Sequence, residues 1–403
     1  MTRNIASEGL KPCTGCGACA LVCPFEAITF EEGCDGFYIP IVSRDRCRNC
    51  SACRKICYKF AENRDLANIS SGKCYAIHSS NRETHLNATS GGAAHEIARW
   101  GIDNGYKVVG VAYDYNDEVA RTIVVDSEEE FKRLRGSKYL QSISHEAFSN
   151  LISIAKSDPT SRFIIIGTPC QINGLRRAMR GLGLSNEVLY VELFCHGVPS
   201  YLLWRRYLKQ QTKSLGKILN IDFRHKRNGW HNYSISIPGE RGTYRNYASR
   251  DLFYRYFFDN VALNKACYSC DFRKGKSAAD IRLGDFLGGS YEHREDGISA
   301  VVTISPQGRM LIETLASEQR IVVVGKHPVS ECLKSQSSEP YANEWLRDEV
   351  LSRLRNGDIT ETYRWYFSRL SRAQRLGSHL KSLVSHLPAG SLTLIRRIVR
   401  AMR

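Results

Sequence analysis

Apolar runs of strand length recur through the middle of the chain, each bounded by glycine, proline or charged residues. The runs "KVVGVAY" (107–113), "FIIIG" (163–167) and "VLYVEL" (188–193) have roughly the five to six residues of a typical strand. A helical pattern precedes the first run at residues 93–100, and another follows the second run after a proline. This alternation of strands and helices predicts an α/β domain.

Two further patterns lie outside this alternation. The segment "NYSISIPGERGTYRNY" carries strand-like runs on both sides of residues 239–242, which predicts a β-hairpin that turns there. From about residue 346 the pattern becomes helical and basic. Apart from the cysteines described below, we see no internal repeat.

The length of 403 residues allows two or three domains. There is no run of 18 apolar residues and no apolar core near the first residues, so we expect neither a membrane-spanning helix nor a secretory signal. A cytoplasmic location follows as an expectation. In that compartment the fifteen cysteines are better interpreted as metal ligands and reactive thiols than as disulfides.

The net charge of +16 is concentrated toward the end of the chain. Residues 362–403 hold nine Lys or Arg and no Asp or Glu, which leaves +7 on the rest. Basic residues there alternate with apolar ones: Trp365, Phe367, Leu370, Leu376, Leu380 and Leu383. Two interpretations stay open: a basic amphipathic helix lying on an anionic membrane, or a helix packed on the protein's own core with a solvated basic face.

Eight cysteines lie in two runs of identical spacing, "CTGCGACALVC" from residue 13 and "CRNCSACRKIC" from residue 47. The spacing C-x2-C-x2-C-x3-C suits a cubane [4Fe-4S] cluster, and in two-cluster ferredoxins the fourth cysteine of each run binds the other cluster. The prediction is one cluster held by Cys13, Cys16, Cys19 and Cys57 and a second held by Cys47, Cys50, Cys53 and Cys23. Pro24 follows the first run as the bacterial pattern requires, whereas Tyr58 stands where the second proline belongs.

Zinc and disulfides are the alternatives for these eight thiols. Zinc sites usually use two separated C-x2-C pairs, so the tandem spacing favours iron–sulfur clusters. Cys34, Cys74 and Cys332 fit no ligand pattern, and we expect them to be small buried hydrophobic residues.

Four more cysteines lie far from the two runs. Cys170 and Cys195 each follow a predicted strand, and open α/β sheets place ligands at the carboxyl ends of parallel strands. Cys267 and Cys270 have C-x2-C spacing. Together the four could bind a third cubane, but a buried Cys170, a catalytic pair of Cys170 with His196, and a zinc knuckle at Cys267 and Cys270 stay open.

The glycine-rich segment "ATSGGAAHEIARW" offers another candidate site. We expect Ser90 to cap the helix at residues 93–100. A glycine-rich turn at a helix N-terminus suits a phosphate or an electron-rich ring edge, although an ordinary capped helix has the same pattern.

Over about residues 8–345 the chain resembles the beta subunit of the coenzyme F-420-reducing hydrogenases and dehydrogenases, especially bacterial relatives encoded among polysaccharide-biosynthesis genes. The resemblance rests on the two cysteine runs and on "ATSGG", "RGSKYLQS", "IIGTPCQINGLR", "FCHGVPS", "DFRHKRNGW", "CYSCDF" and "ADIRLGDFLGG". One departure is Leu287, where the family pattern has an aromatic residue.

The resemblance implies a flavoprotein with FAD beside a third 4Fe-4S cluster. Carried over by motif, the flavin would be lined by Ser90, Gly91, Gly92, Ser137, Lys138 and Tyr139. The third cluster would be held by Cys170, Cys195, Cys267 and Cys270. The family scaffold is not tied to one substrate.

These observations predict four parts. Residues 1–65 form a two-cluster ferredoxin-like (α+β) domain; residues 70–155 and 156–345 form the two pieces of an α/β flavin domain; residues 346–403 form a basic helical tail. The expected function is an FAD-dependent iron–sulfur reductase that passes electrons from a ferredoxin-like donor to a small organic substrate or glycan precursor. An electron-relay subunit of a larger complex is the alternative, and a zinc-stabilised nucleic-acid binder is disfavoured, so we expect no nucleic-acid partner.

Overall fold

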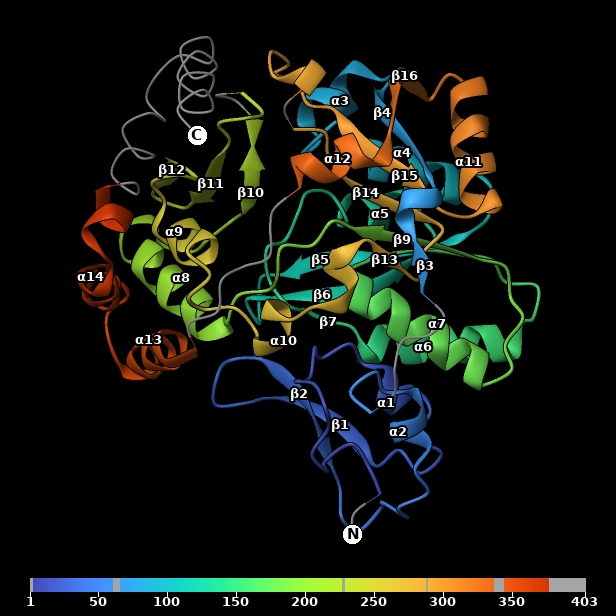
Figure 1. The fold of residues 1–403 in the computed structure, drawn as a ribbon, viewed down its shortest axis with the longest axis horizontal. Coiled ribbons are helices and arrows are strands. Elements are labelled where there is room, and N and C mark those ends of the chain that lie inside the picture. Colours follow the sequence, from blue (N-terminus) through green and yellow to red (C-terminus); the bar gives the residue numbers. More distant parts are fainter. Residues whose placement is uncertain (1–2, 61–65, 227–228, 288, 337–343, 377–403) are drawn as a thin grey trace.

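The computed structural model describes residues 3–60, 66–226, 229–287, 289–336 and 344–376. Its first part is a small α+β domain, drawn at the bottom of Figure 1, in which β1 (Ile28–Glu32) pairs antiparallel with β2 (Tyr38–Val42). The short helices α1 (Ala18–Leu21) and α2 (Ala52–Ile56) each contain the third cysteine of a run. The core of this domain is small: Ile5, Ile28 and the buried Cys19 and Cys53.

The largest unit is a nine-stranded sheet in the order β16-β4-β15-β14-β9-β8-β5-β6-β7. Its strands are β4 (Lys73–Ser79), β5 (Lys107–Asp114), β6 (Val119–Val125), β7 (Ser142–Ile143), β8 (Phe163–Gly167), β9 (Val188–Leu193), β14 (Ile281–Asp285), β15 (Ser299–Thr303) and β16 (Ile321–His327). The pairs β5–β8, β8–β9 and β9–β14 are parallel. The three strands predicted from the sequence are confirmed, and they lie side by side as parallel neighbours.

Both faces of this sheet are covered by helices, as a mostly parallel centre requires. Val108 and Ile164 point into a core shared with α4 and α11, while the next residues, Val109 and Ile165, point into a core shared with α6 and α7. The covering helices are α4 (Ala93–Asp103), α5 (Glu128–Lys132), α6 (His145–Ser157), α7 (Pro169–Gly181), α11 (Pro306–Ser317) and α12 (Val329–Ser335), and α3 (Arg82–Asn87) lies before α4.

A second lobe, at the left of Figure 1, is built around aromatic side chains. Its elements are α8 (Tyr201–Leu215), β10 (Asp222–His225), β11 (Ser234–Gly239), β12 (Gly242–Tyr247), α9 (Leu252–Phe258), α13 (Glu344–Asn356) and α14 (Ile359–Arg369). β11 and β12 form the predicted hairpin, with Gly239 opposite Gly242. The rings of Trp204, Phe223 and Phe253 pack together at the centre of the lobe.

The beginning of the basic tail is part of this lobe. Tyr363 and Tyr366 of α14 are buried in the same core as α8 and α9, and Trp365, Phe367 and Leu370 pack against it. Up to residue 370 the apolar stripe is therefore covered by the protein itself. Leu376, the next residue of the stripe, is exposed, and the part of the predicted amphipathic segment at residues 377–403 lies outside the described residues.

The ferredoxin-like domain is seated on α7 through two glycines that lie two helical turns apart. A Cβ on Gly174 would come within 3.0 Å of the Cys16 Sγ, and a Cβ on Gly181 would come within 2.9 Å of Ile56. Nearby, the amide of Gln141 accepts from the N–H of Tyr38 at 2.8 Å and donates to its carbonyl at 3.1 Å. A side chain larger than a methyl group at these positions of α7 would prevent α1 and α2 from lying this close.

Two short strands, β3 (Ala67–Asn68) and β13 (Lys276–Ser277), pair where the chain passes into the second domain. Within the described residues, the helices are too short or too polar for any of them to cross a lipid bilayer.

Candidate iron–sulfur and flavin site

The two cysteine runs share one backbone conformation as well as one spacing. Gly15 and Asn49, at the same place in each run, have φ of 72° and 51°, and Gly17 and Ser51 have φ of 86° and 67°. Left-handed residues at these two places turn the chain sharply, so that N–H groups face the sulfurs. The second run adopts this turn without glycine, at the cost of some backbone strain.

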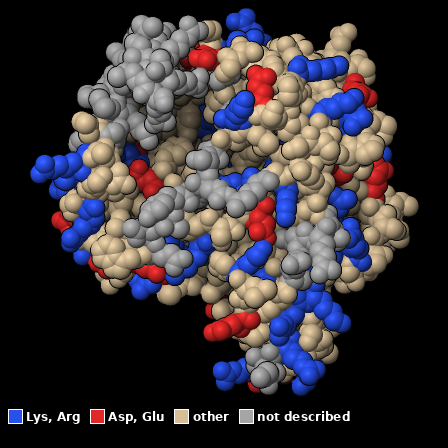
Figure 2. Space-filling model, viewed as in Figure 1, with Lys and Arg blue, Asp and Glu red and all other residues tan. Residues whose placement is uncertain are grey.

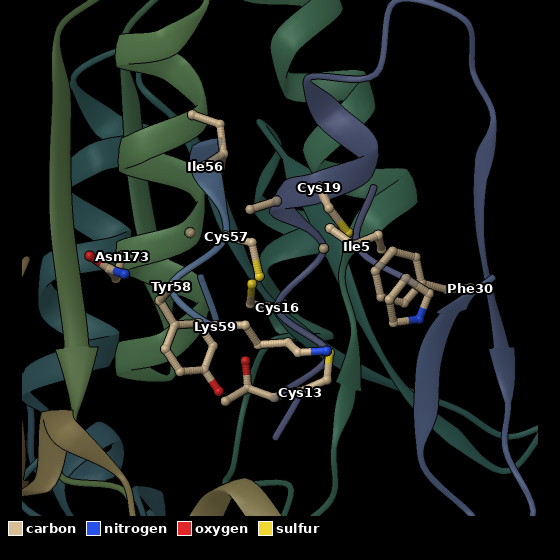
Figure 3. A pocket seen from close by; sticks show the side chains of 15 residues that line it. Ile5, Cys13, Cys16, Cys19, Phe30, Ile56, Cys57, Tyr58, Lys59 and Asn173 are labelled. Atoms are coloured by element: carbon tan, nitrogen blue, oxygen red, sulfur yellow. The ribbon is translucent and has the colours of Figure 1, made fainter. Parts of the chain in front are cut away.

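The fourth cysteine of each run lies with the first three of the other. Cys13, Cys16, Cys19 and Cys57 line one pocket, which we call the proximal pocket because it rests on α7 (Figure 3). Cys23, Cys47, Cys50 and Cys53 line another, which we call the distal pocket. These are the two ligand sets predicted from the spacing.

Both pockets offer hydrogen-bond donors to sulfur. The N–H groups of Gly15 and Ala27 donate to the Sγ atoms of Cys13 and Cys23, each at 3.3 Å. Burial raises the pKa of Cys13 to about 11 and that of Cys57 to about 12. Without a cluster these thiols therefore stay protonated, and loading a cluster would release protons because thiolates are the ligands.

The donor set of both pockets suits iron–sulfur clusters. Within the described residues, no three side chains of Cys, His, Asp or Glu lie close enough together to bind a single metal ion. The thiols surround two spaces, and a cubane fills such a space with its own irons and sulfides. Figure 3 shows Cys16 beside Cys57, Cys13 beside the Lys59 ammonium, and Cys19 across the pocket near Phe30.

Tyr58, which replaces the second proline of the motif, forms part of the wall of the proximal pocket. Its hydroxyl donates to the carbonyl of Pro12 at 2.6 Å, so it ties the end of the second run to the start of the first. Its ring meets Phe272 edge-on at 6.2 Å between centroids. Because Phe272 follows Cys270 closely, Tyr58 also links the proximal pocket to the remaining four thiols.

Those four thiols, the inner thiols, come together from three segments. Cys170 lies in the first turn of α7, Cys195 follows β9, and Cys267 and Cys270 belong to α10 (Lys265–Tyr268) and the start of the 3-10 helix after it (Asp271–Lys274). Burial and then the neighbouring Cys270 raise the pKa of Cys195 to about 11. Burial and then Cys195 raise the pKa of Cys267 to about 12.

Two contacts fix the inner thiols in place. A Cβ on Gly197, which has φ of 144°, would lie 3.2 Å from the Cβ of Cys267, so the turn after β9 abuts α10. The Arg273 guanidinium donates to the carbonyls of His196 and Cys267 and places a positive charge beside Cys195 and Cys267. A cationic neighbour suits a cluster whose thiolates carry net negative charge.

His196 lies at the edge of this group. Its Nε2 is 2.6 Å from the side-chain oxygen of Asn260, while its Nδ1 is buried with no hydrogen-bond partner in the described part of the chain. Its ring packs on Phe257 at 5.0 Å between centroids, and Phe257 meets Tyr139 at 5.5 Å. Two successive ring contacts, His196 with Phe257 and Phe257 with Tyr139, therefore connect the turn after Cys195 with the motif expected to line a flavin.

The predicted cap at Ser90 is wrong. The N-cap of α4 is Gly92, with φ of 94°, and the Ser90 hydroxyl donates instead to the carbonyl of Ile298 at 3.0 Å. The Ser299 hydroxyl accepts from the N–H of Gly91 at 3.0 Å. The chain before α4 passes so close to β4 and β15 that a Cβ on Gly91 would lie 2.4 Å from the carbonyl oxygen of Ile77.

The two motifs assigned to the flavin by resemblance lie next to each other. The Ser137 hydroxyl donates to the Thr89 hydroxyl at 3.3 Å. The Lys138 ammonium donates to four backbone carbonyls at 2.8–3.4 Å, those of residues 133–136. Burial lowers the pKa of Lys138 to about 7. Lys138 therefore holds its own loop closed and points its charge at the backbone, while Ser137 and Thr89 present hydroxyls.

Sequence reasoning missed three charged residues beside these motifs. Lys226 donates to the carbonyls of Ser90 and two other residues at 2.6–2.8 Å, and burial lowers its pKa to about 8. Arg224, which is buried, forms an ion pair with the partly buried Asp285, and its Nε has no hydrogen-bond partner among the described residues. These residues stand in the segments "DFRHKRNGW" and "GDFLGG". Sequence reasoning missed them because no short-range pattern pairs positions about sixty residues apart.

The polar groups gathered here fit an anionic cofactor. The Thr89 hydroxyl and the orphaned Nε of buried Arg224 can donate, Lys226 adds positive charge although its ammonium is bound by three carbonyls, and Tyr139 adds an aromatic ring that packs on Tyr254 at 5.7 Å. A pyrophosphate and an electron-rich ring system would find hydrogen-bond donors and positive charge in this set.

The three cysteines without a ligand pattern differ in environment. Cys74 and Cys332 are buried together in the core under α12, as expected. Cys34 is exposed, so its expected burial is wrong. It lies in the β1–β2 connection, where Arg355 donates to its carbonyl at 2.9 Å.

Comparison with known proteins agrees with this order of parts. Residues 12–29 match the 4Fe-4S binding domain model, and residues 160–328 match the model for the C terminus of the Coenzyme F420 hydrogenase/dehydrogenase beta subunit. One subunit of the F(420)H(2) dehydrogenase of Methanosarcina mazei is 26% identical over 199 residues, 45% of this chain and 53% of that protein. The chain therefore spans about half the length of this curated relative.

A solved structure, the xenon-derivatised F420-reducing [NiFe] hydrogenase complex from Methanosarcina barkeri, is similar with a TM-score of 0.45 and 16% identity over 75% of this chain and 94% of that chain. The 4Fe-4S motif and the matched domains support iron–sulfur electron transfer by an oxidoreductase. In agreement with the resemblance stated from its motifs, the chain is similar over residues 160–328 to the C terminus of the coenzyme F420 hydrogenase/dehydrogenase beta subunits.

Proposed function

We propose that the protein is an FAD-dependent iron–sulfur reductase. Electrons from a ferredoxin-like donor enter at the distal pocket and pass through the proximal pocket and the inner thiols to FAD. A small organic substrate would be reduced at the site that holds FAD. In this assignment the cysteine groups would hold iron–sulfur clusters that supply one-electron transfer, and bound FAD would supply hydride chemistry.

The observation that carries the proposal is the continuity of the three thiol groups. Cys19 of the proximal pocket neighbours Cys53 of the distal pocket in the small core of the first domain. Cys16 neighbours Cys170, because α7 supplies Cys170 from its first turn and Gly174 from its second. From Cys195 the contact of His196, Phe257 and Tyr139 leads to the candidate flavin motifs.

The chain's own residues have distinct tasks in this scheme. The backbone N–H groups at Cys13 and Cys23 stabilise thiolate charge, and Arg273 does so at the inner thiols. The hydroxyls of Thr89 and Ser137, with Arg224, would hold the flavin. The four-carbonyl contact of Lys138 would keep the loop that carries Ser137 in one conformation.

The substrate is proposed more coarsely. A glycan precursor is our choice, on the resemblance to bacterial relatives encoded among polysaccharide-biosynthesis genes. The alternative is an electron-relay subunit without its own substrate chemistry. It is favoured by the names of the relatives, which are a dehydrogenase subunit and a hydrogenase complex.

Anaerobic purification with iron, sulfide and flavin analysis tests the proposal. We expect about twelve irons per chain, from three cubanes of four, and one noncovalent FAD. Eight irons would remove the inner cluster, and zinc in place of iron would overturn the proposal. Turnover of a substrate by the isolated chain with an artificial electron donor separates a reductase from a relay subunit, which would reduce its flavin but release no product.

A further inference from the structure

The distal pocket is the outermost of the three thiol groups. Of its four cysteines, Cys50 is exposed, whereas Cys53 lies in the domain core. The side chain of Phe25, which lines the same pocket, is 42% exposed. An apolar side chain and a thiol that together reach the surface form an apolar centre directly over the pocket.

A positively charged rim lies beside this centre. Arg44, Arg46 and Arg48 are exposed within five consecutive residues, and Arg48 lines the pocket. Among the described residues, none of the three forms an ion pair with a carboxylate. Figure 2 shows Lys and Arg side chains spread over the lobe that Figure 1 identifies as the N-terminal domain.

The neighbouring basic residues differ, since their side chains are engaged within the domain. Arg54 lies over the ring of Phe60 at 4.4 Å from its centroid, and Lys59 lies over the same ring at 5.4 Å. They have packing roles, whereas the three rim arginines have no such contact in the described part of the chain. Unpaired exposed arginines around an apolar centre are typical of a recognition surface for an acidic partner.

We infer that the surface formed by Phe25, Cys50 and the arginines at residues 44, 46 and 48 is the docking site of an acidic one-electron carrier protein. The inference rests on the proposed function and names the partner's surface chemistry and its place of contact. In each encounter the reduced carrier loses one electron and the distal cluster gains it, with no bond made or broken. Long-range attraction to the rim brings the carrier's cofactor over Cys50.

The charge reversal Arg44→Glu/Arg46→Glu tests the inference and spares Arg48, which lines the pocket. The probe is a purified acidic [4Fe-4S] ferredoxin, reduced beforehand and mixed with the full-length, cluster-loaded protein in stopped flow. We expect the second-order rate constant of cluster reduction to fall about tenfold or more at low salt, since steering raises association rates by about 10–10³. The difference should shrink as salt screens the charges.

The matched control is Arg364→Glu/Arg372→Glu, which reverses two exposed arginines in the other lobe, one on α14 and one just after it. It should keep the wild-type rate constant and salt dependence. Reduction by dithionite, a small donor that needs no docking surface, should be the same in the wild type and both variants. Iron content checks that the clusters remain. The conservative pair Arg44→Lys/Arg46→Lys should retain most of the rate.

Each other outcome overturns the inference. An unchanged ferredoxin rate constant in the rim variant would do so, as would an equal loss in the Arg364→Glu/Arg372→Glu control. If dithionite reduces the wild-type protein and ferredoxin does not, the docking site is refuted, whereas the clusters of the proposed function are not. A wild-type protein in which dithionite reduces no cluster would overturn both. If the rim variant loses binding to nucleic acid or to anionic vesicles but keeps the wild-type rate of reduction by ferredoxin, the rim binds another partner and the inference is wrong.

Discussion

If the fourth cysteine of each run binds the cluster of the other run, different pairs of cysteine substitutions should remove different amounts of iron. Cys57 lines the proximal pocket with Cys16, although it belongs to the same run as Cys50. Each cubane is lost when one ligand is removed, so Cys57→Ser should lower the iron content by about four of about twelve per chain. Serine keeps the shape of the side chain and removes the thiolate.

The double variants distinguish exchange from binding within one run. Cys16→Ser/Cys57→Ser removes two ligands of one pocket, so the loss should remain about four irons. Cys50→Ser/Cys57→Ser removes one ligand from each pocket, so the loss should double to about eight. Cys34→Ser, at an exposed thiol outside both pockets, is the control and should lose none.

The assay is anaerobic iron and sulfide quantification, with EPR spectra of the dithionite-reduced protein to count the remaining clusters. Circular dichroism checks that each variant is folded. If the two double variants exchange their results, so that the pair 50 and 57 loses four irons and the pair 16 and 57 loses eight, each run binds its own cluster and the geometric argument is refuted.

Four further predictions concern stability and assembly. Glu192→Leu strands the buried charge of Arg282 and should cost about 3–5 kcal/mol in denaturant unfolding; a cost below about 1 kcal/mol would refute this estimate. Burial raises the pKa of Asp251 to about 6, above the roughly 3.9 of an unfolded chain. The protonated carboxyl therefore stabilises the fold below about pH 4, and this stabilisation, about 3 kcal/mol, is lost as the pH rises to about 6. Asp251→Asn should remove this pH-dependent loss of stability, as measured by melts at a series of pH values. Gly174→Val should lower the iron content by unseating the first domain, whereas Gly174→Ala, which needs a shift of only a few tenths of an ångström, should keep it. Truncation after Leu376 should leave iron, flavin and melting temperature unchanged and abolish any binding to anionic vesicles at low salt; unchanged vesicle binding would exclude residues 377–403 as a membrane contact.

Features encoded by short-range spacing were predictable from the sequence. The two cysteine runs, the strand at residues 163–167 with the helix after it, and the hairpin at residues 234–247 follow from local pattern alone. The grouping of thiols into pockets was predictable too, because the ferredoxin repeat couples spacing to geometry. That these pockets hold clusters stays a prediction.

Features decided by tertiary contact were not predictable. Ser90 looked like a helix cap, but the close approach of β4 and β15 gives that place to Gly92 and draws the Ser90 hydroxyl to Ile298. That Lys138 lines a flavin stays a prediction; its contact with four carbonyls of its own loop is a tertiary feature that no sequence pattern indicates. The pairing of Arg224 with Asp285 joins residues sixty-one positions apart, and nothing in either segment announces it.

The packing of the first domain on Gly174 and Gly181 of α7 bears on the rate at which electrons would leave that domain. A tethered electron carrier would reach its acceptor at a rate set by effective concentration, and lengthening its tether would slow it. Here α1 and α2 pack directly on Gly174 and Gly181, so the proposed transfer between the proximal pocket and the inner thiols would require no diffusive search. That internal step should be indifferent to ionic strength, viscosity and tether length, and only the encounter with the external donor should respond to them.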